Sequence, residues 1–557
     1  MTAAQRIATA ADAAWAIKLE EPLTRLMTGL PVTHIPVGSP DEAASEAARA
    51  AALLAGLQGM DEVGLSETDR LTLDFLRHDL GQVQQATAAW QHASPVTPYA
   101  SMGITYLAQQ LLAPMAIDSM AALDRWSGLW TDMAAAVRGV RARVLAQAAQ
   151  GRRLARPAIE PTLATWDHIR LQLGALLTPS TATAAIVDAD LVPCWTAVAE
   201  RLRDQEVLPA VQGVIELLRD PGYRNAAPDA VGLMHQPGGP AEYQRLLVTH
   251  LTLPHDPQRI HDTGVDEVSR LAERMREVRS RLGFNGSESE FHAALKVNPR
   301  VIAQSADEVA QRYMACMQRL EPLLPNWFAR MPRSPYGVER LAPEQEAGMT
   351  YGYFDKPRTV GERGVYRFNA SDLENRSQLQ VPALIYHELA PGHHFHIARQ
   401  MELDHLPALR RNAMALSVFN EGWAEYASGL AEEMGLYDDP YDLYGRLMHE
   451  RFVAQRLVVD TGMNALGWTL DEARNFMRDN TLEGEAQIAS ETLRYSTDLP
   501  AQALAYRLGY LWFMQLREDT KARRGAAFDI REFHEAVLGE GALPLAAVRG
   551  HVERLMP

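Results

Sequence analysis

Residues 386–394, Tyr-His-Glu-Leu-Ala-Pro-Gly-His-His, constrain the fold of this chain more than any other stretch. They follow an apolar run at residues 381–385, which predicts a buried helix that leads into the motif. Imidazoles and a carboxylate are unfavourable at such depth unless a cationic group pairs with them. A divalent metal ion is a natural partner. We therefore expect a metal-binding helix near the centre of the protein.

The spacing of the histidines departs from the usual His-Glu-x-x-His pattern, in which two histidines four residues apart reach one zinc ion. Here Pro391 occupies the fourth position, and His393 follows six residues after His387, about 120° away on an ideal helix. Pro391 disrupts the helical turn and Gly392 accepts an unusual backbone, so we expect a helix bulge that brings His393 toward His387. His394 is the alternative ligand, although it lies about 10 Å along the axis. If His393 binds the metal, we expect His394 to contact a ligand residue without binding the metal itself.

Two carboxylates fit the remaining roles of such a site. Glu388 is placed to take a proton from water on the metal, because zinc lowers the pKa of bound water toward about 7. Glu421 and Glu425 lie four residues apart on one predicted helix face among apolar residues. Buried carboxylates need partners, so we expect Glu421 to be the third ligand and Glu425 to support a ligand. The alternative, that the histidines are ordinary core residues paired with Glu388, is disfavoured by their combination with Pro-Gly.

The bulk composition excludes some functions. The net charge is -16, from 54 basic and 70 acidic residues, which argues against a nucleic-acid partner because phosphate binding needs a basic face. No run reaches the roughly 20 apolar residues that span a bilayer, and the start of the chain has no apolar signal core. Cys194 and Cys316 stand among apolar neighbours and are expected to be small buried hydrophobes. We therefore expect a cytoplasmic protein with no membrane partner; its oligomeric state is undetermined.

The rest of the chain predicts a mainly α fold. Apolar residues recur at three- and four-residue spacing through the first 220 residues. A long helix is expected at residues 120–150, with Trp126 and Trp130 together in the core. We expect one continuous fold around a central cleft, with an N-terminal helical lobe (1–220), a helical connecting region (221–345) and a catalytic lobe (346–557).

One stretch, residues 349–369, shows a β pattern. Tyr351, Tyr353 and residues 365–369 alternate in a way that predicts a hairpin or two short strands. A strand beside a metal-binding helix can hold an extended substrate by strand addition, which makes Tyr366 and Arg367 candidate substrate contacts. A purely structural hairpin explains the pattern equally well.

Several motifs together resemble known proteins. Asn-Glu-Gly-Trp-Ala, residues 420–424, resembles the third-ligand helix of gluzincin metallopeptidases. The whole set is similar to the domain-of-unknown-function 885 family of bacterial proteins, with motifs at residues 387–394, 421–426, 460–462, 494–495 and 500–506. The resemblance implies a zincin-like helical fold, similar to carboxypeptidase Taq and neurolysin, with one Zn²⁺ per chain and hydrolytic activity.

The resemblance also suggests supporting roles. Tyr506 is the candidate oxyanion donor, because zinc peptidases often supply a phenol opposite the metal, and Tyr495 is the alternative. Asp460 is a candidate to orient a ligand histidine. In the family a histidine usually falls two residues after the glycine of Asp-x-Gly, where this chain has Asn464. An amide can still donate a hydrogen bond to an oxyanion, but this departure leaves the substrate type open.

Arg494 and Gln502 are candidates for substrate binding. Arg494 could hold a substrate carboxylate in bidentate fashion, or could pair structurally with Glu491 or Asp498.

The function that we expect is zinc-dependent cleavage of short peptides, with Glu388 as general base. Hydrolysis of a C–N or amide bond in a small specialised metabolite is the first alternative, which Asn464 keeps open. A non-catalytic metal-binding protein is the second.

Overall fold

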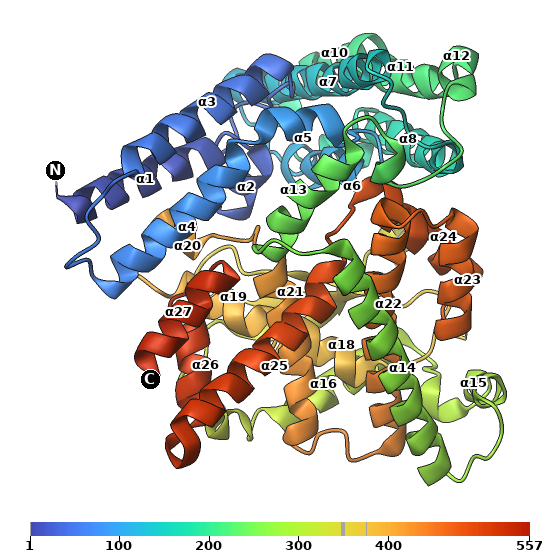
Figure 1. The fold of residues 1–557 in the computed structure, drawn as a ribbon. Helices are drawn as coiled ribbons and strands as arrows, with labels where there is room; N and C mark the ends of the chain where they lie inside the picture. Colours follow the sequence, from blue (N-terminus) through green and yellow to red (C-terminus); the bar gives the residue numbers. More distant parts are fainter. Residues whose placement is uncertain (1, 347–350, 375) are drawn as a thin grey trace.

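The computed structural model describes residues 2–346, 351–374 and 376–557, and it confirms the mainly α class (Figure 1). The N-terminal helices are α1 (Ala3–Lys18), α2 (Pro22–Met27), α3 (Pro40–Leu57), α4 (Glu67–Val83), α5 (Ala86–His92), α6 (Pro98–Leu107), α7 (Met120–Ala149), α8 (Arg156–Leu176), α9 (Thr181–Ala184), α10 (Val192–Arg201), α11 (Leu208–Arg219) and α12 (Pro221–Asn225). The central helices are α13 (Gly239–Leu251), α14 (Pro257–Arg281), α15 (Glu288–Lys296), α16 (Ala306–Leu320) and α17 (Pro343–Glu346). The C-terminal helices are α18 (Val381–Glu388), α19 (His393–Met401), α20 (Ala408–Arg411), α21 (Ser417–Glu433), α22 (Pro440–Ala465), α23 (Leu470–Asn480), α24 (Glu485–Leu493), α25 (Leu504–Arg524), α26 (Ile530–Leu538) and α27 (Leu545–Leu555).

The N-terminal helices form an upper layer over the C-terminal helices, and both chain ends lie on the same side (Figure 1). One core cluster lies within residues 32–227. A larger cluster joins α1, α3 and α4 to the C-terminal helices, so the first helices of the chain share a core with the last ones. The lobe boundaries at residues 220 and 345 stay a prediction.

The long helix α7 carries its two tryptophans as predicted. Trp126 and Trp130 are both buried, and their rings meet edge to face with centroids 6.2 Å apart. The prediction for the cysteines was partly wrong. Both are free thiols, but Cys194 is exposed on α10 and Cys316 is half-buried, because apolar neighbours in sequence need not lie on the inward face of a helix.

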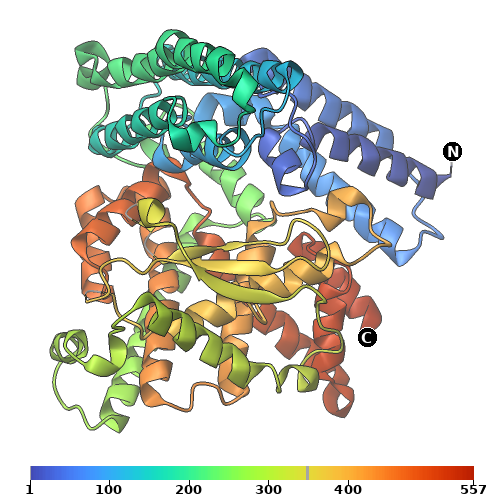
Figure 2. The ribbon, with the colours of Figure 1, turned by 180° about the vertical axis from the view of Figure 1, so that it is seen from behind.

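A small sheet contains the predicted hairpin and one further strand. Strand β2 (Gly352–Asp355) pairs antiparallel with β3 (Gly364–Phe368), which confirms the hairpin; Met349 lies outside the described residues. Strand β1 (Tyr336–Arg340), which we did not predict, pairs parallel with β3 on its other side. Figure 2 shows this sheet in yellow, on the face of the molecule opposite to that in Figure 1.

Close packing of two helices sets the position of α21. Gly422 of α21 and Gly509 of α25 face each other, and a Cβ atom at Gly422 would lie 2.5 Å from the Gly509 Cα atom. A side chain at either position would therefore push the two backbones apart. Since α21 also carries Glu421, this contact fixes where that carboxylate lies.

Adding a methyl group at this crossing is expected to destabilise the protein. Gly422→Ala should lower the free energy of unfolding by about 1–3 kcal/mol, measured by urea denaturation, because the close backbones cannot relax around it. The matched control is Gly128→Ala in α7, where a Cβ atom meets nothing within 4 Å. That change should raise stability by up to about 1 kcal/mol through helix propensity. Equal effects at both positions would contradict the packing argument.

A neutral histidine sits deep in the C-terminal core. His534 of α26 is fully buried; its Nδ1 lies 2.8 Å from the Trp327 carbonyl oxygen, and its Nε2 lies 2.8 Å from the Tyr426 hydroxyl. The carbonyl requires a proton on Nδ1, so Tyr426 donates to Nε2 and the ring carries no charge. Burial lowers the pKa of His534 to about 3.

This histidine should make stability depend on pH. Below the ordinary histidine pKa of about 6.5 the unfolded chain binds a proton that folded His534 refuses, so stability is lost as pH falls toward 3. His534→Asn should reduce the slope of the unfolding free energy between pH 6.5 and 4 by up to about 1.4 kcal/mol per pH unit. Urea unfolding at several pH values measures this slope. His405→Asn, at an exposed histidine, is the control, and parallel curves for wild type and His534→Asn would contradict the assignment.

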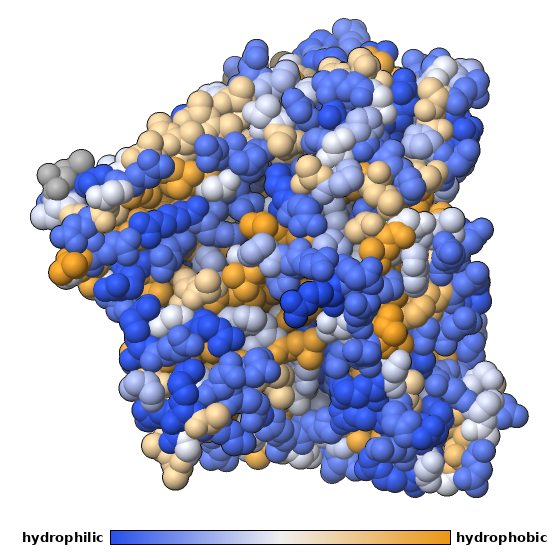
Figure 3. Space-filling model, viewed as in Figure 1, coloured by the Kyte–Doolittle hydropathy of each residue, from blue (hydrophilic) through white to orange (hydrophobic). Residues whose placement is uncertain are grey.

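The surface is mostly hydrophilic on the face drawn in Figure 3, with apolar residues gathered across the middle, where the upper helical layer meets the lower one. In the described part of the chain, no helix combines the length and apolar character needed to cross a membrane.

Candidate metal centre

The motif that opens the site is a break between two helices, where we expected a bulge in one. Helix α18 ends at Glu388 and α19 begins at His393, with a cis peptide bond between Ala390 and Pro391. A Cβ atom at Gly392 would collide with the carbonyl oxygen of His387, so only glycine fits this turn. The break redirects the chain, which brings His393 back beside His387 with ring centroids 4.7 Å apart.

Three side chains from three helices converge on one point. Glu421 Oε2 lies 3.5 Å from His387 Nε2 and 3.2 Å from His393 Nε2. Their possible ligand atoms all lie within 4.8 Å of one another. Glu421 Oε2 is buried and has no hydrogen-bond partner among the described residues. A cation at this point would satisfy that oxygen, and two imidazoles with one carboxylate form a donor set suited to zinc.

A second set of contacts holds His387 from behind. Glu425 Oε1 lies 3.0 Å from His387 Nδ1 and 2.7 Å from His449 Nε2, while Arg446 Nη1 lies 3.4 Å from Glu425 Oε2. Glu425 therefore stands where the sequence predicted support for a ligand. Sequence reasoning missed His449 and Arg446. No motif marks either residue; the structure shows that α22, which carries both, is buried along most of its length, polar residues included.

His387, Glu425 and His449 also lie close enough to hold a metal ion. This second group is the weaker candidate, because both oxygens of Glu425 already have cationic or hydrogen-bonding partners. Glu421 has an unsatisfied oxygen instead. The group of His387, His393 and Glu421 is therefore the better fit for a cation.

Burial and neighbouring charges shift the pKa values of the ionisable groups in this site. Burial lowers the pKa of His387, but the adjacent carboxylates of Glu421 and Glu425 outweigh burial and raise it to about 10. Burial raises the pKa of Glu421, yet His393 and His387 lower it below its ordinary value. For Glu388, which is close to these groups, burial is the largest effect and raises the pKa. A carboxyl with a raised pKa is a better proton acceptor when ionised.

The two candidate tyrosines lie at different depths. The Tyr506 ring stacks against the His387 ring, with centroids 6.1 Å apart. The guanidinium of Arg456, a residue of α22, lies 4.7 Å from the centroid of the Tyr506 ring. Tyr495 is fully buried one layer farther away: its hydroxyl donates to Glu491 and accepts from Arg456 Nε at 2.8 Å. Tyr506 therefore lies beside His387 of the candidate cluster, whereas the Tyr495 hydroxyl is engaged by Glu491 and Arg456.

Asp460 does not orient a ligand histidine, which corrects the sequence prediction. Its carboxylate accepts hydrogen bonds from the Tyr243 hydroxyl at 2.7 Å, the Ala501 amide at 2.9 Å and Asn464 Nδ2 at 3.3 Å. It anchors the segment before α25 to α22, and the partner of His387 Nδ1 is Glu425 instead.

Asn464 is also structural, against our expectation of an oxyanion donor. Its Nδ2 donates to the Tyr495 carbonyl at 2.9 Å and its Oδ1 accepts from the Leu233 amide at 3.0 Å. The side chain is buried and its hydrogen-bonding groups are occupied. Position along the motif could not reveal this, because the contacts come from segments far apart in sequence.

The His394 side chain, on α19, contacts the small sheet and not the candidate metal centre, so the prediction that it supports the ligands was wrong. Its Nε2 lies 2.9 Å from the Ser334 carbonyl oxygen, and its ring packs edge to face against Tyr336 and Phe354. A Cβ atom at Gly364 would collide with this ring. His393 and His394 are consecutive residues of α19, so their side chains point about 100° apart around the helix. The break before α19 sets which of the two faces His387.

The two residues of β3 face opposite ways. Tyr366 is fully buried against Tyr313, with ring centroids 5.3 Å apart, whereas Arg367 pairs with Asp355 and Glu339, each at 3.1 Å. Both are engaged within the fold, and neither contact identifies a substrate group.

Arg494 and Gln502 contact each other through a hydrogen bond of 2.8 Å. Arg494 also lies 3.6 Å from Glu491, the structural partner that we considered, and its guanidinium lies 4.9 Å from the Tyr99 ring centroid. Both side chains are half-buried and lie near Tyr506. A role of the pair in substrate binding stays a prediction.

Comparisons with known proteins agree with this architecture. A family model described as "Bacterial protein of unknown function (DUF885)" matches residues 22–552. A solved structure called a "putative lipoprotein", from Colwellia psychrerythraea, has 23% identity and a TM-score of 0.87, over 100% of this chain and 99% of that one. A "putative lipoprotein of unknown function" from Shewanella oneidensis has 16% identity and a TM-score of 0.72, over 99% of both chains. At these identities the likeness concerns the fold alone, and no curated protein matches the chain.

Proposed function

Since the chain belongs to the DUF885 family of bacterial proteins, whose function is unknown, we propose that it is a zinc-dependent hydrolase that cleaves short peptides. The observation that carries the proposal is the convergence of His387 Nε2, His393 Nε2 and Glu421 Oε2 around an unsatisfied carboxylate oxygen. A kinship with gluzincins of the neurolysin and carboxypeptidase Taq type is part of this proposal, as is a cytoplasmic location.

The chemistry divides between the metal and the protein. A bound zinc ion supplies Lewis acidity, which polarises a carbonyl group and lowers the pKa of water. Glu388, next to the first ligand and buried beside the cluster, accepts the proton of the attacking water and returns it to the leaving amine. Glu425 holds His387 through Nδ1, so that Nε2 keeps its lone pair for the cation.

Tyr506 is the group that we propose for the oxyanion. Its ring lies nearly parallel to the His387 ring, with an angle of 8° between the planes. Burial is the largest effect on its phenol and raises the pKa, so the hydroxyl keeps its proton and can donate it in a hydrogen bond. Tyr495 lacks this freedom, because its hydroxyl already serves Glu491 and Arg456.

Peptide hydrolysis is preferred to the small-metabolite alternative. The sequence feature that favoured that alternative was Asn464, and its amide is occupied by Leu233 and Tyr495. A non-catalytic metal-binding protein would need the same ligands but not Glu388. Metal content of the purified protein by elemental analysis, with turnover on a library of short peptides, tests the proposal. Zinc without turnover on any amide would support the non-catalytic alternative.

A further inference from the structure

A second site lies outside the metal cluster, in a pocket of about 600 Å³ between the α7–α8 turn and the segment at residues 232–236. Arg152, Arg153 and His92 line it, together with Ser496 and the Tyr223 side chain. We propose that this pocket binds a small organic anion, a carboxylate or phosphate ester that carries an apolar portion.

The two arginines are the first reason. Within the described residues neither guanidinium forms an ion pair, although the protein carries a net charge of -16 and most of its arginines have carboxylate partners. Arg152 donates only to oxygens of neutral groups, the Pro237 carbonyl at 3.1 Å and the Gln150 side chain. Both side chains are half-buried, and no carboxylate lines the pocket in the described part of the chain, so an anion that enters it meets two guanidiniums and no competing negative group.

Buried donors without partners are the second reason. Arg153 Nε and His92 Nδ1 are both shielded from solvent and lack a hydrogen-bond partner in the described parts of the chain. Buried polar atoms are nearly always satisfied in folded proteins. Glu242 acts electrostatically on His92, but it already pairs with Arg245 at 2.6 Å. Arg153 Nε is a donor, and an acceptor that enters from outside the chain would satisfy it; the neutral His92 ring can either donate or accept at Nδ1.

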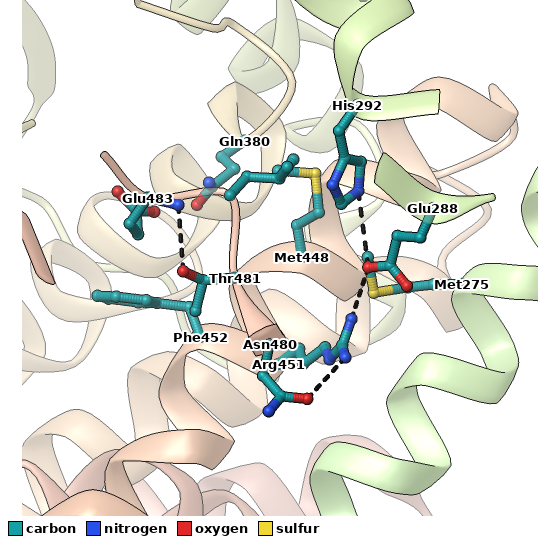
Figure 4. A pocket seen from close by; sticks show the side chains of 11 residues that line it. Met275, Glu288, His292, Gln380, Met448, Arg451, Phe452, Asn480, Thr481 and Glu483 are labelled. Atoms are coloured by element: carbon teal, nitrogen blue, oxygen red, sulfur yellow. Dashed lines mark hydrogen bonds and ion pairs between the residues drawn. The ribbon is translucent and has the colours of Figure 1, made fainter. Parts of the chain in front are cut away.

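Another pocket shows the contrast. In the pocket drawn in Figure 4, Glu288 lies 2.6 Å from the Arg451 guanidinium and 3.6 Å from the His292 ring. Asn480 Oδ1 accepts a further hydrogen bond from Arg451 at 2.8 Å. In that pocket a carboxylate of the chain itself already pairs with the guanidinium, which distinguishes it from the pocket of Arg152 and Arg153.

The backbone around the arginines is held in place. Gly151 takes φ 79°, a left-handed conformation that lets the chain turn directly after α7. The Arg153 carbonyl accepts a hydrogen bond from Gln236 Nε2 at 3.1 Å, and Leu154 N donates to the Tyr223 hydroxyl at 3.1 Å. The α8 N-terminus adds positive potential, since Ala155 lines the pocket and offers no side-chain cap.

The lining also indicates the polarity of the ligand. The volume of about 600 Å³ includes space that is open to solvent, so it does not fix the size of the ligand. Leu154, Tyr223 and Leu233 give one wall an apolar character, while guanidiniums bind carboxylate and phosphate oxygens in bidentate fashion. This inference does not depend on the metal centre, because none of these residues contacts a proposed ligand.

The test uses the full chain and two probes, inorganic phosphate and succinate, in low-chloride buffer. Isothermal titration calorimetry should detect saturable binding of at least one probe to the wild type. The double variant Arg152→Gln/Arg153→Gln should weaken that binding by about tenfold or more. Arg138→Gln, on the exposed face of α7, should bind as the wild type does. Phosphate binding alone would indicate a phosphate ester, and succinate binding alone a carboxylate.

Circular dichroism of each variant separates lost binding from lost folding. If the double variant fails to fold, Arg153→Lys serves instead: it keeps the charge, loses the bidentate geometry and should weaken binding several-fold. If neither probe binds at about 10 mM, roughly ten times a Kd of 1 mM, the proposal is overturned. Equal affinity in the wild type and in a folded arginine variant would overturn it as well.

Discussion

Glu388→Gln is expected to lower the turnover of a peptide substrate by about 10²–10⁴-fold while the zinc content stays unchanged. Glutamine has nearly the shape of glutamate but cannot accept a proton at neutral pH. The side chain does not belong to the group of His387, His393 and Glu421, so its loss leaves the ligand set complete. The measurement combines kcat and KM for one cleaved peptide with elemental analysis of the same preparation.

The control is Glu432→Gln, a surface residue of α21 that pairs with Arg274 at 2.7 Å. It should leave both zinc content and turnover at the wild-type level. A variant Glu388→Gln that holds zinc and cleaves at the wild-type rate would remove Glu388 from the mechanism. Loss of zinc together with activity would instead make Glu388 part of the metal-binding machinery.

Two adjacent histidines should differ completely in their effect on metal binding. His393→Ala is expected to lower zinc affinity by more than about 100-fold, because it removes one of three donor atoms. This loss exceeds the roughly 10–100-fold effect of mutating a residue that only hydrogen-bonds to a ligand. His394→Ala should keep zinc, since the His394 ring nitrogen lies 2.9 Å from the Ser334 carbonyl and the ring packs on the sheet. Competition with a chromogenic chelator measures both affinities.

Stability separates the two variants further. His394→Ala should lower the free energy of unfolding by about 2 kcal/mol or more, because it opens a cavity beside Tyr336 and Phe354. Metal content is therefore compared per folded molecule, with native state confirmed by circular dichroism. Zinc retained in His393→Ala and lost in His394→Ala would reverse the assignment of the ligand.

Much of the candidate site could be predicted from local sequence. His387, Glu388 and Glu421 combine charge with apolar neighbours, and a buried polar group needs a partner wherever the chain goes. The Pro391-Gly392 pair predicted that something must happen to the helix between the histidines. Its form, a break in place of a bulge, depends on the Gly392 backbone fitting against the His387 carbonyl, which is a contact in three dimensions.

The errors share one cause. Asp460, Asn464 and His394 are polar residues in conspicuous motifs, and each one is engaged by segments distant in sequence: Tyr243 for Asp460, Leu233 for Asn464 and Ser334 for His394. His449 was missed for the converse reason. It stands in no motif. Only the packing of α22 against α18 brings its ring near His387, where Glu425 of α21 contacts both histidines.

The sequence by itself determined the helical class, the short β segment and the residues of the candidate metal cluster, because hydrophobic period, turn chemistry and burial of charge are local properties. Only the tertiary structure decided which polar residues meet. It paired Glu425 with His387 and His449, turned the His394 ring toward the sheet, and left Arg152 and Arg153 without a carboxylate partner among the described residues. Hydrogen bonds and ion pairs act over a few ångströms in space, and the order of residues in the chain does not specify those distances.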